Sequence, residues 1–368
     1  MNLTKSIDFL LEHAGDVIRY RLHKEILKDL TQNEEEKLLD KVKLTPHYKL
    51  VESYVKPNGY IGLGMHSWDK FKATPLQDGE AAARLLANYA IPKESPIIVN
   101  YIKALRDEKL LEEEFSYYNP EKARFRDRFK GLSNGGGLMV LVYTMQALLG
   151  YGDEEEVKPF LSTCYQAFRS MLSINSLEEI TSFQPNSKKK YNYPYIQENV
   201  PLPCCYHLTA LSHTDSWRNP QSIEAMADAL NHINRIMSEE NNVHIKIGSK
   251  YYVPLWAFVR PLKPFEANRQ HTIMRRTLTE IAMLGVGDRV EIIRQSIEYV
   301  KEALSTDGIL RYRFLSAYDK KRFLDSMRYP TPYSEVGLET DYKKETSIWC
   351  DLTFWAVQFL HILGQSDL

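Results

Sequence analysis

The sequence predicts an all-α fold in which six helical hairpins form a ring, with one small β-hairpin near residues 243–259. Apolar and polar residues partly alternate in that stretch, as in a strand. The prediction of a ring is based on a repeated pattern of an apolar helix, a short break and an amphipathic helix. The pattern occurs in residues 79–109, 136–172, 204–237 and 271–304. A helix that is apolar on all sides must be surrounded by protein, so we expect the apolar helices to form an inner layer and the amphipathic helices to cover it.

The breaks contain residues that begin helices. Ser95 precedes Pro96 and Asn219 precedes Pro220, and each pair is typical of an N-cap followed by the first helical position. Residues 213–216 read His-Thr-Asp-Ser, a composition that resembles a catalytic triad. Neighbours in sequence rarely form a triad, whose members come from separate segments. We interpret these four residues as the turn between two helices.

The two ends of the chain complete the pattern. Residues 17–27 and 34–55 form an opening helix pair, and residues 345–364 form a last apolar helix with no partner after it. The first helix, residues 5–13, supplies that partner. We therefore expect the first and last helices to be in contact, so that six apolar and six amphipathic helices close into one domain, residues 1–368.

The composition of the chain limits the classes of partner that we expect it to bind. Lys and Arg number 47 and Asp and Glu 48, so the net charge of −1 gives no electrostatic footprint for nucleic acid or an anionic membrane. Residues 138–149 form the most apolar stretch, which is shorter than the roughly 20 residues of a membrane span. Four cysteines are too few for a disulfide framework, and the N-terminus does not resemble a signal peptide. We expect a cytoplasmic protein whose partner is a small-molecule ligand, without nucleic acid or membrane.

Three segments carry a family resemblance. Residues 15–27, 59–71 and 77–92 read GDVIRYRLHKEIL, GYIGLGMHSWDKF and QDGEAAARLLANYAIP. They resemble the α/α-toroid superfamily, which includes squalene and other terpenoid cyclases and protein prenyltransferase β subunits, and the likeness is nearest to uncharacterised bacterial proteins with that toroid. The resemblance covers most of the chain as an architecture. It implies an (α/α)6 toroid whose inner helices line a central cavity.

The sequence departs from the catalytic motifs of that superfamily. It contains no DxDD, no DDxxD and no QxxxxxW element. Cyclisation begins with a strongly acidic carboxylic acid, for which the candidates are Asp78, Asp215 and Asp351. We select Asp78, Glu80 and Asp351 as the candidate catalytic residues, because we expect them at or near the starts of inner helices. For each of them, capping of a helix N-terminus is the alternative role.

The resemblance also implies a zinc ion, because protein prenyltransferases and the lanthipeptide cyclases with the same toroid hold one in the cavity. A catalytic zinc takes three protein ligands and keeps one open position. The nearest set in this chain is Cys204, His207 and Cys350, of which the first two share a helix face. The alternative is that the cysteines are small buried fillers and the histidine a core residue.

Aromatic residues suggest the chemistry of a ligand. An aromatic face can stabilise a carbocation, stack on a sugar ring or cover a lipid chain, and plain core packing is the alternative. Trp68 lies beside His66 in a loop-like stretch, where function is frequent. The candidate substrate-binding residues are His66, Trp68, Tyr143, Tyr206, Trp349 and Trp355.

The sequence thus predicts a toroid protein that binds a hydrophobic or aromatic-compatible small molecule in a central cavity, as a terpenoid-cyclase-like or prenyltransferase-like enzyme. Two alternatives stay open. A carbohydrate-active enzyme of glycosidase or lyase type needs paired carboxyl groups, one of them with a raised pKa. A non-catalytic binding or scaffold protein would keep the ring without the motifs.

Overall fold

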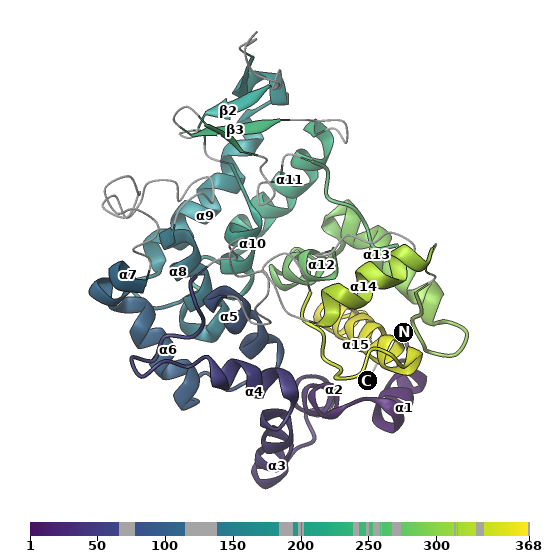
Figure 1. The fold of residues 1–368 in the computed structure, drawn as a ribbon. Coiled ribbons are helices and arrows are strands. Elements are labelled where there is room, and N and C mark those ends of the chain that lie inside the picture. The colour runs from purple at the N-terminus through teal and green to yellow at the C-terminus, as the bar shows by residue number, and fades with distance from the viewer. Residues whose placement is uncertain are drawn as a thin grey trace. The chain divides into compact units, whose positions relative to one another are not determined.

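The computed structural model describes residues 1–65, 78–114, 138–183, 194–197, 200, 202–237, 243–247, 250–252, 258, 260–266, 274–312, 314, 316–328 and 335–366. The described chain is mostly helical (Figure 1). It groups into two compact units. Unit 1 comprises Met1–Tyr117, Pro264–Met283 and Ile293–Leu368, and unit 2 comprises Tyr118–Lys263 and Leu284–Ile292. The mostly helical character that the sequence predicts is confirmed, while the ring and the single domain stay predictions.

Unit 1 contains the helices of both chain ends. They are α1 (Thr4–His13), α2 (Asp16–Arg21), the π-helix η1 (Leu22–Leu27), α3 (Gln32–Lys43), α4 (Pro46–Ser53), α5 (Gly79–Asn88), α6 (Pro96–Arg106), α7 (Glu108–Glu114), α12 (Met274–Met283), most of α13 (Glu291–Leu304), α14 (Ala317–Arg328) and α15 (Glu345–Ile362). The expected single helix over residues 34–55 is wrong, since α3 and α4 divide it. Thr45 is extended because the following Pro46 disfavours helical backbone before it.

The first and last helices are in contact, as the sequence predicts. Helix α1 packs against α15. The amino group of Met1 donates to the carbonyl of Gln365 at 3.0 Å, and Gln358 Nε2 donates to Glu25 Oε2 at 2.9 Å. These contacts join residues more than 300 positions apart in the chain.

Unit 2 contains two layers of helix and a small sheet. Its helices are α8 (Leu138–Gln146), continued by the π-helix η4 (Ala147–Tyr151), α9 (Lys158–Ser170), the 3-10 helices η5 (Met171–Ser173), η6 (Leu177–Ile180) and η7 (Gly287–Arg289), α10 (Cys205–Ser212) and α11 (Pro220–Ile236). Helix α10 packs against α8 and α9, and α11 packs against α9. All eight residues of α10 are buried.

The sheet of unit 2 follows the order β1-β2-β3-β4. Its strands are β1 (Thr181–Ser182), β2 (Tyr195–Gln197), β3 (His244–Ile247) and β4 (Lys250–Tyr252). Strands β3 and β4 pair antiparallel with Ile245 opposite Tyr252, which confirms the β-hairpin predicted near residues 243–259. Strand β2 adds in parallel to β3, and β1 pairs antiparallel with β2.

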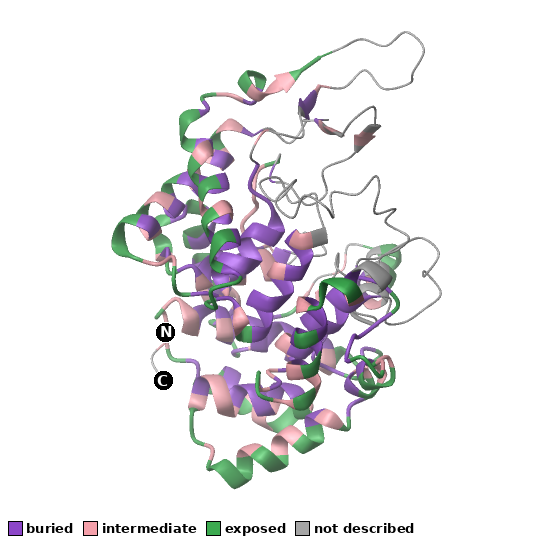
Figure 2. Ribbon diagram, turned by 90° about the vertical axis from the view of Figure 1, so that its left-hand side faces the viewer, coloured by how far each residue is buried: buried purple, intermediate pink, exposed green. Residues whose placement is uncertain are grey.

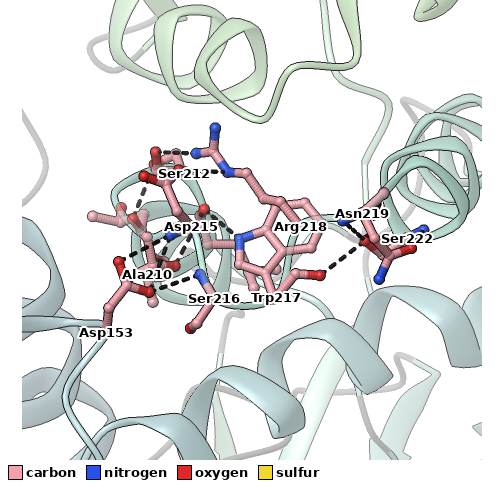
Figure 3. Close-up of polar contacts among 12 residues, drawn as sticks. Asp153, Ala210, Ser212, Asp215, Ser216, Trp217, Arg218, Asn219 and Ser222 are labelled. Carbon is pink, nitrogen blue, oxygen red and sulfur yellow. Dashed lines mark hydrogen bonds and ion pairs between the residues drawn. The ribbon is translucent and has the colours of Figure 1, made fainter.

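Residues 213–216 form the turn between α10 and α11, as predicted. The carboxylate of Asp153 accepts hydrogen bonds from the backbone N–H groups of Asp215 at 3.1 Å and Ser216 at 2.8 Å (Figure 3). Helix α11 then begins with a capping box, in which Asn219 Oδ1 accepts from Ser222 N at 2.9 Å. The polar side chains of this turn therefore fix the angle at which the chain enters α11.

Burial separates inner from outer helices (Figure 2). In α5, every residue from Gly79 to Leu86 is buried, and α15 is buried along most of its length. In α3, by contrast, only Val42 is buried. Of the helices in the described ranges, none combines the length and the apolar character that a bilayer span requires.

A buried carboxylate network as the candidate functional site

Asp351 lies in the second turn of α15, inside unit 1, with only 3% of its surface exposed. Its Oδ1 atom is 3.4 Å from Nη1 of Arg275. Its Oδ2 atom accepts a hydrogen bond from the backbone N–H of Leu338 at 3.1 Å and another from the hydroxyl of Tyr342. Three donors thus converge on this one buried carboxyl group.

Arg275 connects Asp351 to a second carboxylate. It lies in the first turn of α12 and is 4% exposed. Its Nε atom donates to Glu335, and its backbone N–H donates to Glu335 Oε1 at 2.7 Å. Burial lowers the pKa of Arg275, but the charges of Glu335 and Asp351 outweigh burial and hold that pKa above its ordinary value. Burial raises the pKa of Glu335, and the guanidinium opposes that rise.

Residues 335–342, which we name the strap, run between α14 and α15 without helix or strand. Glu339 is buried and fixed at both ends. Its backbone N–H donates to the hydroxyl of Tyr342 at 3.1 Å, and its Oε1 atom accepts from the backbone N–H of Gly15 at 2.8 Å. The Tyr342 hydroxyl therefore lies between Glu339 and Asp351.

Glu339 is a carboxyl group with a strongly shifted pKa. Burial raises its pKa to about 7, and the charges of Asp351 and Asp16 raise it as well. The N–H of Gly15 and the charge of Arg19 act in the opposite direction. Glu339 therefore changes its protonation state near neutral pH.

The predicted pair Asp78 and Glu80 lies at the start of α5 in the same unit. Asp78 is the N-cap residue, and its Oδ1 atom accepts from the backbone N–H of Ala81 at 2.8 Å, which is the capping role weighed as the alternative. Glu80 Oε1 accepts from Arg84 Nε at 3.0 Å. Arg84 in turn lies 4.0 Å from Glu280 of α12. Helix α12 thus contributes to this second charged cluster as well as to the one around Asp351.

Two of the predicted aromatic residues lie in unit 1. Trp355 is buried, stacks on Phe359 with 5.3 Å between ring centroids, and contacts Phe265 at 4.4 Å. Its Nε1 atom donates to the backbone carbonyl of Arg275 at 3.3 Å, so its indole borders the carboxylate network. Trp349 is half-buried, and the guanidinium of Arg311 lies 5.0 Å from its ring centroid.

The other predicted aromatic residues are divided between unit 2 and the undescribed part of the chain. Tyr143 stacks on Phe160 with 5.5 Å between centroids, and Tyr206 is buried on α10. Both contacts fit core packing of unit 2. His66 and Trp68 lie outside the described residues.

The candidate zinc ligands are distributed over both units. Cys204 and His207 belong to unit 2 and Cys350 to unit 1, and all three are buried. Burial and the neighbouring Cys205 raise the pKa of the Cys204 thiol, and burial raises the pKa of Cys350 to about 12. Zinc binds the thiolate, which these shifts oppose. Among the side chains that the structure describes, no group of three His, Cys, Asp or Glu residues is placed to hold a metal ion.

Sequence reasoning did not find four members of the network, namely Arg275, Glu335, Glu339 and Tyr342. Arg275 resembles a surface charge on an amphipathic helix, and the strap has no periodicity. One usable signal is the pair of glutamates four residues apart in a segment that directly precedes the last apolar helix.

Comparisons of the chain with protein-family models, with curated protein sequences and with solved structures find no match. The network itself offers specific chemistry. Asp351 is a carboxyl group fixed by three donors, and Glu339 is a carboxyl group that can donate a proton near neutral pH. Two carboxyl groups in such different environments are a common arrangement for acid–base catalysis.

Proposed function

We propose that the chain is an acid–base enzyme acting on an uncharged small molecule, with Asp351 as the base and Glu339 as the proton donor. The observation that carries the proposal is the joint environment of these two side chains. Asp351 receives three hydrogen-bond or ionic donors, whereas burial beside Asp351 raises the pKa of Glu339 to about 7. Near neutral pH Glu339 can release a proton, and we assign the role of base to its neighbour Asp351.

The proposed proton transfers follow from the contacts. Asp351 takes a proton from the substrate or from an attacking water, and Glu339 gives its proton to the departing oxygen, so that the total charge of the pair is unchanged. The guanidinium of Arg275 and the hydroxyl of Tyr342 keep Asp351 oriented. Both transfers belong to hydrolysis or elimination at a C–O bond, the chemistry of a glycosidase or lyase.

This environment supports base chemistry better than the start of a terpenoid cyclisation. Protonation of an alkene requires a carboxylic acid that points its proton at the substrate, whereas both oxygen atoms of Asp351 already face donors of the protein. The aromatic cluster of Trp355, Phe265 and Phe359 favours the second candidate, a terpenoid-cyclase-like protein that holds a hydrophobic molecule.

We also propose that the helical hairpins close into an (α/α)6 toroid, with the substrate in its central cavity and the protein in the cytoplasm. The contact of α1 with α15 supports closure, because a ring built from one chain brings its first and last helices together. The complete burial of α10 and of residues 79–86 supports an inner layer.

A substrate panel tests the proposed function. The wild-type chain is incubated with nitrophenyl glycosides of neutral hexoses and pentoses, and in a separate arm with squalene and farnesyl diphosphate. We expect turnover of a glycoside, with kcat about 10²–10⁴-fold lower in Asp351→Asn and in Glu339→Gln. Glu345→Gln is the matched control, since Glu345 is an exposed carboxylate on the same helix as Asp351.

Circular dichroism and the melting temperature confirm that each variant is folded. Two results contradict the acid–base proposal: turnover of no glycoside by the wild type, or an Asp351→Asn variant as active as the wild type. Conversion of squalene or farnesyl diphosphate alone would instead support the second candidate.

A further inference from the structure

The strap makes several polar contacts to the residues of the candidate site, and its Leu338 and Tyr342 are buried as well. Glu335 binds Arg275, the N–H of Leu338 donates to Asp351, and Tyr342 donates to the same carboxylate. The strap has no helix or strand of its own to stabilise it. Its position therefore depends on the backbone N–H of Gly15, the N-cap residue of α2, on Arg275 of α12 and on Asp351 of α15.

Close packing shows that the strap fits tightly over Asp351. Gly337, Leu338, Glu339 and Tyr342 are buried. At Gly337, even an added Cβ atom would come within 3 Å of the Tyr342 side chain. At Gly15, an added Cβ atom would lie 2.9 Å from Glu339 Oε2. Asp351 and Arg275 are 3% and 4% exposed, so a ligand reaches them only when a segment packed on them moves, and the strap is the one such segment here without helix or strand among the residues described.

We propose that the strap is a lid over the acid–base site and that the contact of Glu339 with Gly15 is its clasp. The lid opens to admit substrate to Asp351 and closes to place Glu339 beside it. This inference rests on the proposed function for its purpose, but opening is measurable without any substrate. Closure also removes water from the site, which strengthens the electrostatic interactions inside it.

The charges around the clasp make the lid sensitive to pH. Glu339 faces Asp351 from α15, Asp16 and Arg19 from α2, and the N–H of Gly15. Its pKa is about 7 in the closed strap against an ordinary value of 4.5, so the closed strap favours protonated Glu339. Protonated Glu339 therefore contributes its full stabilisation of the closed strap below pH 4.5, and this contribution is lost as the pH rises through 7. Protonation of Glu339 thus favours the closed strap because of burial and the nearby acidic groups, while the N–H of Gly15 opposes part of this effect.

Hydrogen exchange of the strap amides in the full chain tests the lid. After correction for the intrinsic exchange rate, the opening equilibrium of residues 335–342 should rise about tenfold between pH 6 and pH 8 if opening returns Glu339 to its ordinary pKa of 4.5. Glu339→Gln should abolish this rise, because glutamine does not titrate. Glu345→Gln, which removes an exposed carboxylate outside the strap, should keep it.

A second variant tests the clasp by its geometry. Gly15→Ala places a methyl group against the Glu339 carboxylate and should increase strap exchange at both pH values. Exchange that is independent of pH in the wild type, or equally pH-dependent in Glu339→Gln, would overturn the inference, as would strap amides that do not exchange at all. Loss of the proposed activity with normal strap exchange would instead count against the proposed function alone.

Discussion

The guanidinium of Arg275 and the carboxylate of Asp351 meet in the interior of unit 1, although 76 residues separate them in the chain. Their approach places α12 beside α15, which are also in contact as helices. Glu335 completes the group from the strap, so that one buried cation serves two buried anions.

Removal of Arg275 should destabilise the chain strongly. In Arg275→Met, the carboxylates of Glu335 and Asp351 lose their shared positive charge inside the protein, and breaking such a buried pair typically lowers the free energy of unfolding by about 3–5 kcal/mol. Urea unfolding followed by circular dichroism measures it. Arg311→Met is the control, because Arg311 pairs with Asp307 near the surface, where an ion pair contributes about 0–1 kcal/mol. Equal effects of the two variants would contradict a buried network.

Removal of the Tyr342 hydroxyl oxygen should also lower the stability of the folded chain. Tyr342→Phe deletes the hydroxyl that donates to Asp351 and accepts from the N–H of Glu339, and leaves both groups without that partner. We expect the free energy of unfolding to fall by about 1–3 kcal/mol. Tyr318→Phe, at a tyrosine with 72% exposure, should change it by less than about 0.5 kcal/mol. A Tyr342→Phe variant as stable as the wild type would show that the two hydrogen bonds of this hydroxyl make no net contribution to stability.

Two substitutions distinguish the helix-capping role of Asp78 from a catalytic role. Asparagine is as good an N-cap as aspartate, so Asp78→Asn should keep the stability of α5, whereas Asp78→Ala should lower the free energy of unfolding by about 1–2 kcal/mol. Thermal unfolding of both variants measures the difference. Loss of catalytic turnover in a stable Asp78→Asn variant would instead assign the carboxylate to catalysis.

The cysteines should react slowly in the folded chain. All four are buried, burial raises the pKa of Cys350 to about 12, and the thiolate is the reactive form. At pH 8 we expect a disulfide reagent such as dithionitrobenzoate to label native Cys350 at least about 100-fold more slowly than the urea-unfolded chain. Tyr318→Cys supplies an exposed thiol as an internal standard. Rapid labelling of native Cys350 would contradict its burial, and protection that a chelator abolishes would support the predicted zinc.

The pattern of apolar and amphipathic helices predicted the helical class and the contact of α1 with α15, because both follow from where apolar residues must be buried. The sequence did not predict the break between α3 and α4, which the restriction that Pro46 imposes on Thr45 explains. It also missed β1 and β2. Strands of two and three residues are too short for a pattern, and β2 finds its parallel partner β3 after 46 intervening residues.

The candidate site was predictable only in part, for a related reason. Asp351 is a charged residue on an otherwise apolar helix, and that contrast marks it in the sequence. The partners of Asp351 do not stand out from their sequence neighbours in this way. Tyr342 and Glu335 lie in a segment without periodicity, and Arg275 belongs to a helix with ordinary charged neighbours. Their roles arise from tertiary packing, which brings three separate segments to one carboxylate.

Helix α12 places Arg275 beside Asp351 and, five residues later, Glu280 near Arg84. A small rotation or translation of this one helix would strain both sets of ion pairs together. The changes in the free energy of unfolding caused by substitutions at Arg275 and at Arg84 should therefore be non-additive, although no direct bond joins the two side chains. A double-mutant cycle would measure this coupling through α12.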